Sequence, residues 1–172
     1  MSGSSSRRDS GREGPRAQLP LLDRLIDDAP DAERDPPLSA TEAMAVLRRG
    51  VRRDLEALLN ARPRWRSWPP GYAELKVSPL AFGIRDFTVG GITDARERER
   101  LCAEIEETIR LFEPRFASVR VSLLDRPDQL DANLRLRIEA LLHAEPAPEP
   151  IAFDTLIDPS SADAVVRSRD DV

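Results

Sequence analysis

The sequence predicts an α+β fold, in which two main helices pack on a small, mainly antiparallel sheet of three or more strands. Apolar residues recur at steps of three and four in residues 39–60 and again in residues 94–112, as on one face of a helix. After residue 116 they occupy every second position in three separate stretches, which is typical of strands with one buried face. With 172 residues, 40% of them hydrophobic, the chain can bury one core of ordinary size.

The two ends of the chain differ from this central part. Residues 1–18 are rich in Ser, Gly and Arg and almost free of apolar side chains, so we expect a disordered tail. Residues 19–38 combine a short amphipathic segment, LPLLDRLID, with an acidic linker that contains proline. The polar residues 159–172 are expected to form a second disordered tail. A single α+β domain is therefore expected over residues 39–158.

The first helix is expected to begin with a capping box. Ser39 and Glu42 follow the Ser-x-x-Glu pattern, in which the hydroxyl and the carboxylate each accept a hydrogen bond from a backbone amide. Its apolar stripe is expected to contain Met44, Leu47, Val51, Leu55 and Leu58. A basic run lies on the other face: Arg48, Arg49, Arg52 and Arg53. We interpret this run as a solvated helix face rather than a binding patch.

Residues 64–91 are rich in Pro, Gly and aromatic residues and are expected to form a long connection. A short strand or hairpin is expected around residues 81–84. The aromatic residues of this stretch are Trp65, Trp68, Tyr72, Phe82 and Phe87. We expect most of them to fix the connection to the core, rather than to form a surface that stacks on carbohydrate.

The second helix is expected to start at Asp94, with Glu97 in its first turn. Its buried stripe should contain Leu101, Ile105, Ile109 and Phe112. Three strands are then expected around residues 119–123, 134–139 and 151–155. The last of them, extended to residue 157, is expected to offer a sheet edge to which a partner strand could add.

The composition argues against several classes of function. A net charge of −5 gives no general attraction to nucleic acid or to anionic lipid. The single cysteine, Cys102, excludes an internal disulfide and is expected to be a core residue, and the lone His143 indicates no metal site. No stretch has the length of a membrane span or the form of a signal peptide, so we expect a cytoplasmic protein. No catalytic or cofactor-binding motif is present in the sequence.

One charged pair lies at the break between the second helix and the first strand. In LFEPRF, residues 111–116, Pro114 cannot continue the helix, so Glu113 and Arg115 must lie on the break. Side chains two apart on extended chain point to the same side, so the two charges face outward together or inward together. The motif is therefore either a helix stop with a local ion pair, or a pair of charges offered to a neighbouring chain.

Several segments together resemble a known family. They are LLDRL at 21–25, RDLEALLNAR at 53–62, SPLAFGIRDF at 78–87, IRLFEPRF at 109–116, LRLRIEALL at 134–142 and EPIAFDTLID at 149–158. These segments resemble the baseplate wedge proteins of contractile injection machines. They are most similar to the TssE-type baseplate subunits of bacterial type VI secretion systems, which are related to the small, "lysozyme-like" wedge proteins of contractile phage tails.

The resemblance implies a structural protein without catalytic residues or cofactors. It implies that Glu113, Pro114 and Arg115 bind the larger wedge subunits, which are of the TssF and TssG type. It further implies contact with the first ring of the contractile sheath, built from TssB/TssC-type proteins. The expected location is a baseplate docked at the inner-membrane complex, with no nucleic acid, small-molecule substrate or direct membrane insertion. The alternative is a peptidoglycan-cleaving glycosidase, as the family's old label suggests.

Overall fold

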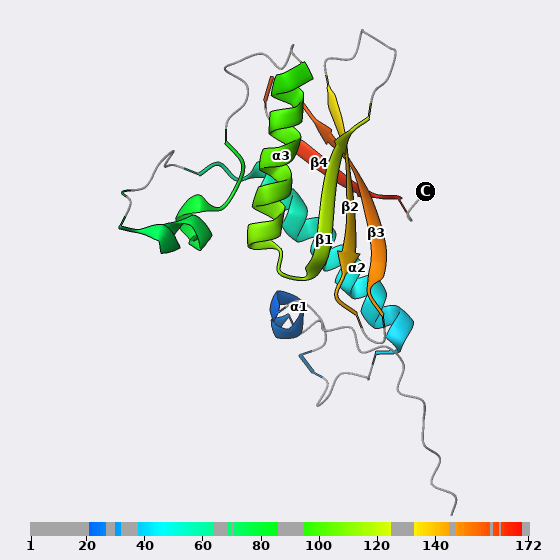
Figure 1. Ribbon diagram of the computed structural model, residues 1–172. Coiled ribbons are helices and arrows are strands. Elements are labelled where there is room, and N and C mark those ends of the chain that lie inside the picture. Colours follow the sequence, from blue (N-terminus) through cyan, green and yellow to red (C-terminus); the bar gives the residue numbers. More distant parts are fainter. Residues whose placement is uncertain are drawn as a thin grey trace, which may run out of the picture.

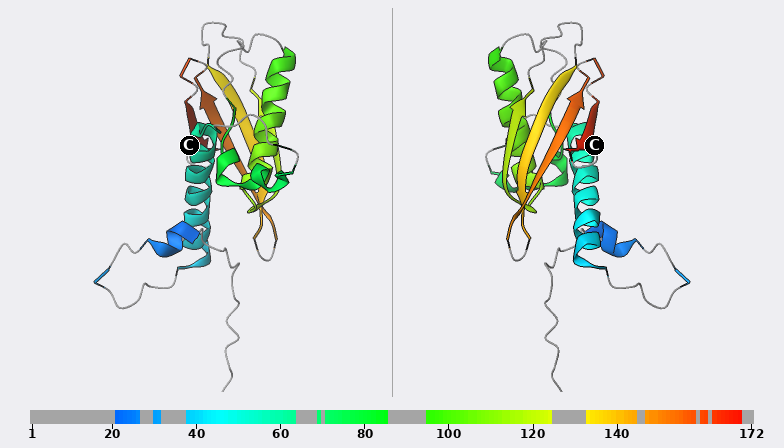
Figure 2. Two further views of the ribbon diagram at one scale, coloured as in Figure 1. Left: turned by 90° about the vertical axis from the view of Figure 1, so that its left-hand side faces the viewer. Right: turned by 90° about the vertical axis from the view of Figure 1, so that its right-hand side faces the viewer.

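The computed structural model shows two long helices on one face of a four-stranded antiparallel sheet (Figure 1), so the predicted α+β class is confirmed. The structure describes residues 21–26, 30–31, 38–63, 69, 71–85, 95–124, 133–144, 147–158, 160–161 and 163–169. The helices are α2 (Ala40–Asn60) and α3 (Ala95–Phe112). When the molecule is turned by 90°, one view shows the sheet in front of both helices, with its other face uncovered (Figure 2).

Helix α2 begins and packs as the sequence predicts. Ser39 lies at its N-cap, and its hydroxyl accepts from the backbone amide of Glu42 while the Glu42 carboxylate accepts from the backbone amide of Ser39. Four of the five residues expected in its apolar stripe are buried, and the fifth, Met44, is partly buried. The buried residues of the helix are Leu47, Gly50, Val51, Leu55, Leu58 and Leu59.

The connection after α2 differs from the prediction. Two short 3₁₀ helices, η1 (Ala73–Val77) and η2 (Pro79–Ala81), replace the strand or hairpin expected around residues 81–84. The Ser78 hydroxyl accepts from the amide of Leu80, and a proline follows at the first helical position, so a tight helical turn forms here instead. Trp65, Trp68 and Phe87 lie outside the described residues.

Two aromatic residues of this connection are described, and only one of them packs on the core. The Phe82 ring meets the Phe112 ring of α3 edge-on, with ring centroids 5.4 Å apart. The Tyr72 side chain is exposed, so the interpretation of the aromatic residues holds for Phe82 and not for Tyr72.

Helix α3 buries the expected stripe of Leu101, Ile105 and Ile109, with Phe112 partly buried beside it. Cys102 is also buried, as predicted. The N-terminal cap expected at Asp94 lies outside the described residues. The helix packs mainly on the first strand, and its side chains complete the core between the helices and the sheet.

The sheet contains the three predicted strands and one more. They are β1 (Phe116–Leu123), β2 (Leu134–Leu142), β3 (Glu149–Ile157) and β4 (Ala164–Ser168), paired in that order. Strand β4 lies within the segment expected to be a disordered tail, so that prediction is wrong for residues 164–168. The same strand covers β3, which is therefore an interior strand rather than the edge expected from the sequence.

Side chains of the helices protect parts of both sheet edges. At β4 the Asn60 side chain of α2 acts like a neighbouring strand, because it donates to the carbonyl of Ala164 at 2.9 Å and accepts from the same residue's amide at 2.8 Å. At β1 the amide of Val121 donates to the carboxylate of Glu106 on α3 at 3.2 Å. Groups that would otherwise invite strand addition are thus bonded within the chain.

The basic run of α2 is not a purely solvated face. Arg48 forms an ion pair with Glu149 of β3 at 2.6 Å, and Arg53 binds Asp23 of α1 (Leu21–Leu25), the short helix formed by the expected amphipathic segment. Arg52 donates to the carbonyl of Val166 in β4. The run therefore ties α2 to three other elements, which its pattern in the sequence did not indicate.

Candidate functional site

The corner between α3 and β1 is fixed by its backbone. The amide of Glu113 makes the last helical bond, to the carbonyl of Ile109 at 2.8 Å, and its carbonyl accepts from the amide of Phe116 at 3.2 Å. The carbonyl of Arg115 accepts from the amide of His143 at the end of β2, at 2.8 Å. Pro114, between the two charged residues, restricts the remaining torsion and stays exposed. The corner is therefore held by α3, by its own turn and by β2.

The two charged side chains of the corner bind each other, as one of the two readings of the sequence predicts. Arg115 donates through Nε to Oε2 of Glu113 at 2.9 Å, and Nη2 contacts the same oxygen. Glu113 is only 8% exposed, whereas 22% of the Arg115 side chain remains exposed. The pair faces inward, and Glu113 is not offered to solvent as a free charge.

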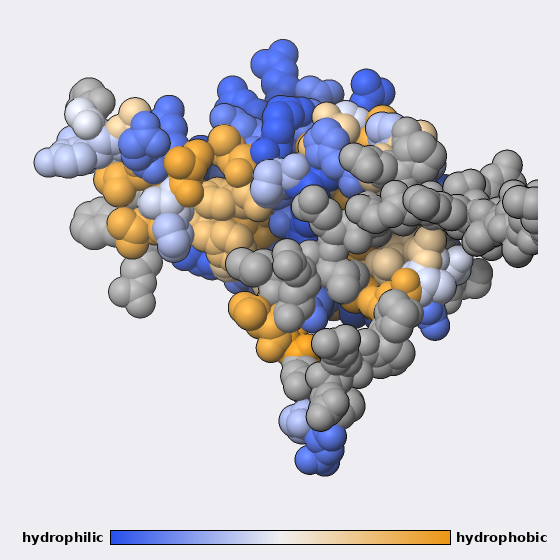
Figure 3. All heavy atoms as spheres, turned by 90° about the horizontal axis from the view of Figure 1, so that it is seen from below, coloured by the Kyte–Doolittle hydropathy of each residue, from blue (hydrophilic) through white to orange (hydrophobic). Residues whose placement is uncertain are grey.

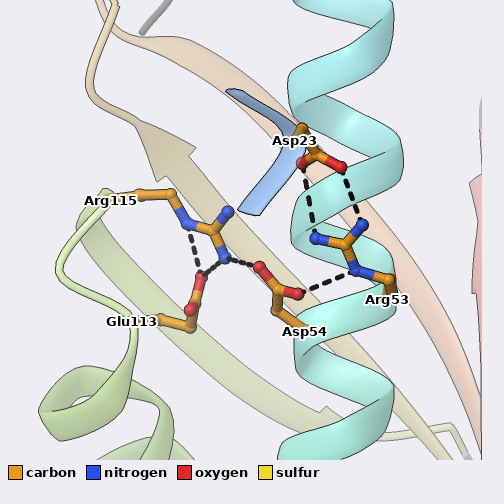
Figure 4. Close-up of polar contacts among 5 residues, drawn as sticks. All are labelled: Asp23, Arg53, Asp54, Glu113 and Arg115. Carbon is orange, nitrogen blue, oxygen red and sulfur yellow. Dashed lines mark hydrogen bonds and ion pairs between the residues drawn. The ribbon is translucent and has the colours of Figure 1, made fainter. Parts of the chain in front are cut away.

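Three further charged residues continue this pair into one network (Figure 4). Nη2 of Arg115 also donates to Oδ2 of Asp54 on α2 at 2.8 Å, and the other oxygen of Asp54 accepts from Nε of Arg53 at 3.1 Å. Arg53 then binds both carboxylate oxygens of Asp23 on α1, at 2.7 and 3.3 Å. Charges of alternating sign thus connect the corner, α2 and α1.

Two opposing effects act on the pKa of the Glu113 carboxyl group in this network. Burial raises the pKa of Glu113, and the neighbouring Arg115 opposes this rise by favouring the charged form. The Asp23 carboxylate raises the pKa of Arg53 through their hydrogen bonds. Glu113 is therefore held by a balance between the cost of burying its charge and the attraction of one guanidinium group.

A carboxyl with a raised pKa beside a second carboxylate is also a feature of glycosidases. Here, however, the same Nη2 atom of Arg115 lies between Glu113 and Asp54 and binds both. A general acid must reach the glycosidic oxygen, but Glu113 is buried and its bonded oxygen is directed at Arg115. The geometry suits a clamp that holds a guanidinium group rather than an acid that acts on a sugar.

The clamp leaves part of Arg115 available. Its Nη1 atom makes no hydrogen bond to any residue that the structure describes, and Figure 4 shows it pointing away from both carboxylates. Two leucines of the neighbouring helices are exposed, Leu111 of α3 at 44% and Leu25 of α1 at 74%. In the view from below, apolar side chains gather in patches on this face of the molecule, and charged ones border them (Figure 3).

Comparison with known proteins adds the identity of the family. A family model described as baseplate wedge protein gp25 matches residues 45–147, more than half of the chain. The chain belongs to this family. No curated protein matches it. The protein is therefore a structural baseplate wedge protein, and its family implies contacts with other baseplate components.

The region that matches the gp25 family includes most of α2 and all of α3, the corner, β1 and β2. Three members of the charged network were missed from the sequence, namely Asp23, Arg53 and Asp54. Asp54 is 61 residues away from Arg115 along the chain, and no local pattern links the two. Among the described helices, none combines the length and the apolar character that crossing a membrane requires.

Proposed function

We propose that this protein is the TssE-type wedge subunit of a bacterial type VI secretion system. In this role it joins the larger wedge proteins, of the TssF and TssG type, to the first ring of the contractile sheath. The membership in the gp25 family and the segments quoted above support the proposal. The assembly acts in the cytoplasm, docked at the inner-membrane complex.

The observation that carries the proposal is the orientation of Arg115. Glu113 and Asp54 fix its guanidinium group from two sides, while Nη1 makes no hydrogen bond to another described residue. A partner that offers a carboxylate or backbone carbonyls at this point would bind a side chain whose rotamer is already set. Less conformational entropy is then lost on binding.

In this proposal the three residues of the corner have different roles. Arg115 makes the contact, Glu113 holds Arg115 in place, and Pro114 keeps the turn rigid and packs against the partner. Exposed apolar side chains of α1 and Leu111 extend the contact around the charged group. A small apolar rim around a held arginine is a frequent arrangement at interface hot spots.

On the sheath side we propose that strand addition takes place at β1, at the part of its edge that follows Val121. The outer edge of β4 is occupied by Asn60 and Arg52, and the Val121 amide of β1 is bonded to Glu106. Along β1, Leu124 pairs inward with Arg135, so the preceding Leu123 directs its amide outward. Leu123→Pro should remove that outward donor without breaking the ladder to β2, and should reduce sheath recruitment.

Co-purification with the two larger wedge subunits tests the proposal. Arg115→Lys keeps the charge, but an ammonium group cannot bind two carboxylates and a partner in the same planar geometry, so we expect recovery of the complex to fall at least tenfold. Arg49→Lys on the exposed face of α2 is the matched control and should leave recovery unchanged. Equal recovery of both variants would exclude the corner as the contact.

A purified full-length chain should not cleave peptidoglycan. Turnover that disappears in Glu113→Gln would favour the glycosidase instead.

A further inference from the structure

The face of the sheet that the helices leave uncovered has a hollow of its own. It has a volume of about 780 Å³ and is lined on the open face by Ser118, Arg120, Glu139, Leu141, Pro150 and Ala152, with Arg169 just after β4. The charged network of the corner contributes no residue to it. The hollow therefore belongs to a different surface from the one in the proposed function.

Short side chains explain why the sheet is hollow at this place. Ser118, Leu141 and Pro150 lie opposite one another on neighbouring strands, and Ala152 follows two positions after Pro150 on the same face. Ser, Pro and Ala extend little above the sheet, whereas long arginine side chains stand around them. The floor is apolar because Leu141, Pro150 and Ala152 form it.

The charge beside this floor is unbalanced. Arg137 is neutralised by Asp154, with contacts of 2.9 and 3.4 Å, and Glu139 lies opposite Arg120 across β1 and β2. Arg167 and Arg169 are both exposed, and neither forms a hydrogen bond or an ion pair with another described residue. Arg167 lies opposite Asp154 across β3 and β4, but Arg137 already binds that carboxylate. A positive excess thus lies along β4, in a chain whose net charge is −5.

The spacing of these two arginines suits one kind of ligand. Residues two apart in a strand are about 6.8 Å apart along its axis, and residues four apart in a helix are about 6 Å apart along its axis. A helix lying parallel to β4 can therefore place carboxylates at positions i and i+4 opposite Arg167 and Arg169. Its diameter of about 10 Å covers roughly two strand spacings, which are β2 and β3 with their apolar floor.

We propose that this hollow is a docking site for an acidic amphipathic helix of a partner protein. Small apolar side chains of that helix cover Leu141, Pro150 and Ala152, and its carboxylates bind Arg167 and Arg169. The site shares no residue with the Glu113–Arg115 corner, so the chain can bind two partner segments at different surfaces.

Peptide binding to the full-length protein tests this docking site. The probe is a synthetic, fluorescently labelled helical peptide of about 18 residues, long enough to hold its helix, with Glu at i and i+4 beside an Ala/Leu stripe. Fluorescence anisotropy should show that Arg167→Glu/Arg169→Glu weakens binding at least tenfold. Arg49→Glu/Arg100→Glu makes the same charge change on exposed positions of the helices and should weaken it less than twofold. Ala152→Phe, which fills the hollow without a charge change, should also weaken it at least tenfold.

Three results would overturn the proposal. The first is absence of binding, or equal binding by the two charge-reversed proteins. The second is equal binding of a peptide with Lys in place of both Glu residues, which would mean that the apolar floor alone selects the ligand. The third is self-association of the wild type in sedimentation that the Arg167→Glu/Arg169→Glu change abolishes, because the face would then bind a second copy. A thermal melt of each variant confirms that it is folded.

Discussion

Removal of Arg115 should destabilise the isolated protein, because its guanidinium group neutralises a buried carboxylate. Arg115→Ala eliminates the contacts to Glu113 and the 2.8 Å contact to Asp54. The Asp54 side chain is 33% exposed, so that pair should contribute only about 0–1 kcal/mol. Glu113 is 8% exposed, and breaking a fully buried pair costs about 3–5 kcal/mol.

The expected loss lies below that upper range, because Glu113 can take up a proton when its partner is absent. We expect the free energy of unfolding at neutral pH to fall by about 2–3 kcal/mol. For a chain of this size this corresponds to a melting temperature lower by roughly 5–10 °C. A circular dichroism melt and urea unfolding measure both quantities.

A matched variant and a double mutant identify the cause. Arg110→Ala removes an exposed arginine that pairs with Glu106 one turn away, and should cost only about 0.5 kcal/mol. Glu113→Gln combined with Arg115→Ala removes the buried charge as well, and should recover about 1 kcal/mol or more relative to Arg115→Ala alone. A melt of Arg115→Ala within about 1 °C of the wild type would refute this reasoning.

Three other predictions concern Glu113, the β4 edge and the turn at Gly83. Burial raises the pKa of Glu113, so the stability that its protonated form contributes is complete below about pH 4.5 and is lost as pH rises through the raised pKa. In urea unfolding at several pH values, the free energy of unfolding of Glu113→Gln should therefore rise relative to that of the wild type as pH increases. Asn60→Ala removes both side-chain bonds to Ala164 and should cost about 1–3 kcal/mol, with faster amide hydrogen exchange in β4. Gly83 has φ of 115°, and an added Cβ would lie 2.3 Å from the carbonyl oxygen of Ala61, so Gly83→Ala should cost more than about 1 kcal/mol in urea unfolding.

The main elements could be predicted because their signals are local. The capping box at Ser39 and the apolar stripes of α2 and α3 each lie within one segment, as does the alternation in β1, β2 and β3. Strand β4 gives only a five-residue signal, AVVRS, in a polar tail. It forms because β3 offers a ladder and Asn60, 104 residues earlier, binds its outer edge. A single sequence does not contain that pairing as a pattern.

The candidate site could be predicted only where its signal is local. Pro114 between Glu113 and Arg115 marks the corner locally, and the ion pair that the structure shows is one of the two arrangements that the sequence left open. The direction of the pair does not follow, because it depends on the packing of α3 and β1 against α2. Asp54 and Asp23 join the network only after that packing is formed.

The central claim is that Arg115, held by Glu113 and Asp54, is the contact to the larger wedge proteins. A cryo-electron microscopy map of the reconstituted wedge, in which side chains are resolved at the corner, tests it most directly. We expect Arg115 to keep both carboxylate contacts and its Nη1 to lie about 2.7–3.2 Å from an acceptor oxygen of a partner subunit. A wedge in which the corner faces solvent, with the larger subunits bound elsewhere on the chain, would contradict the claim.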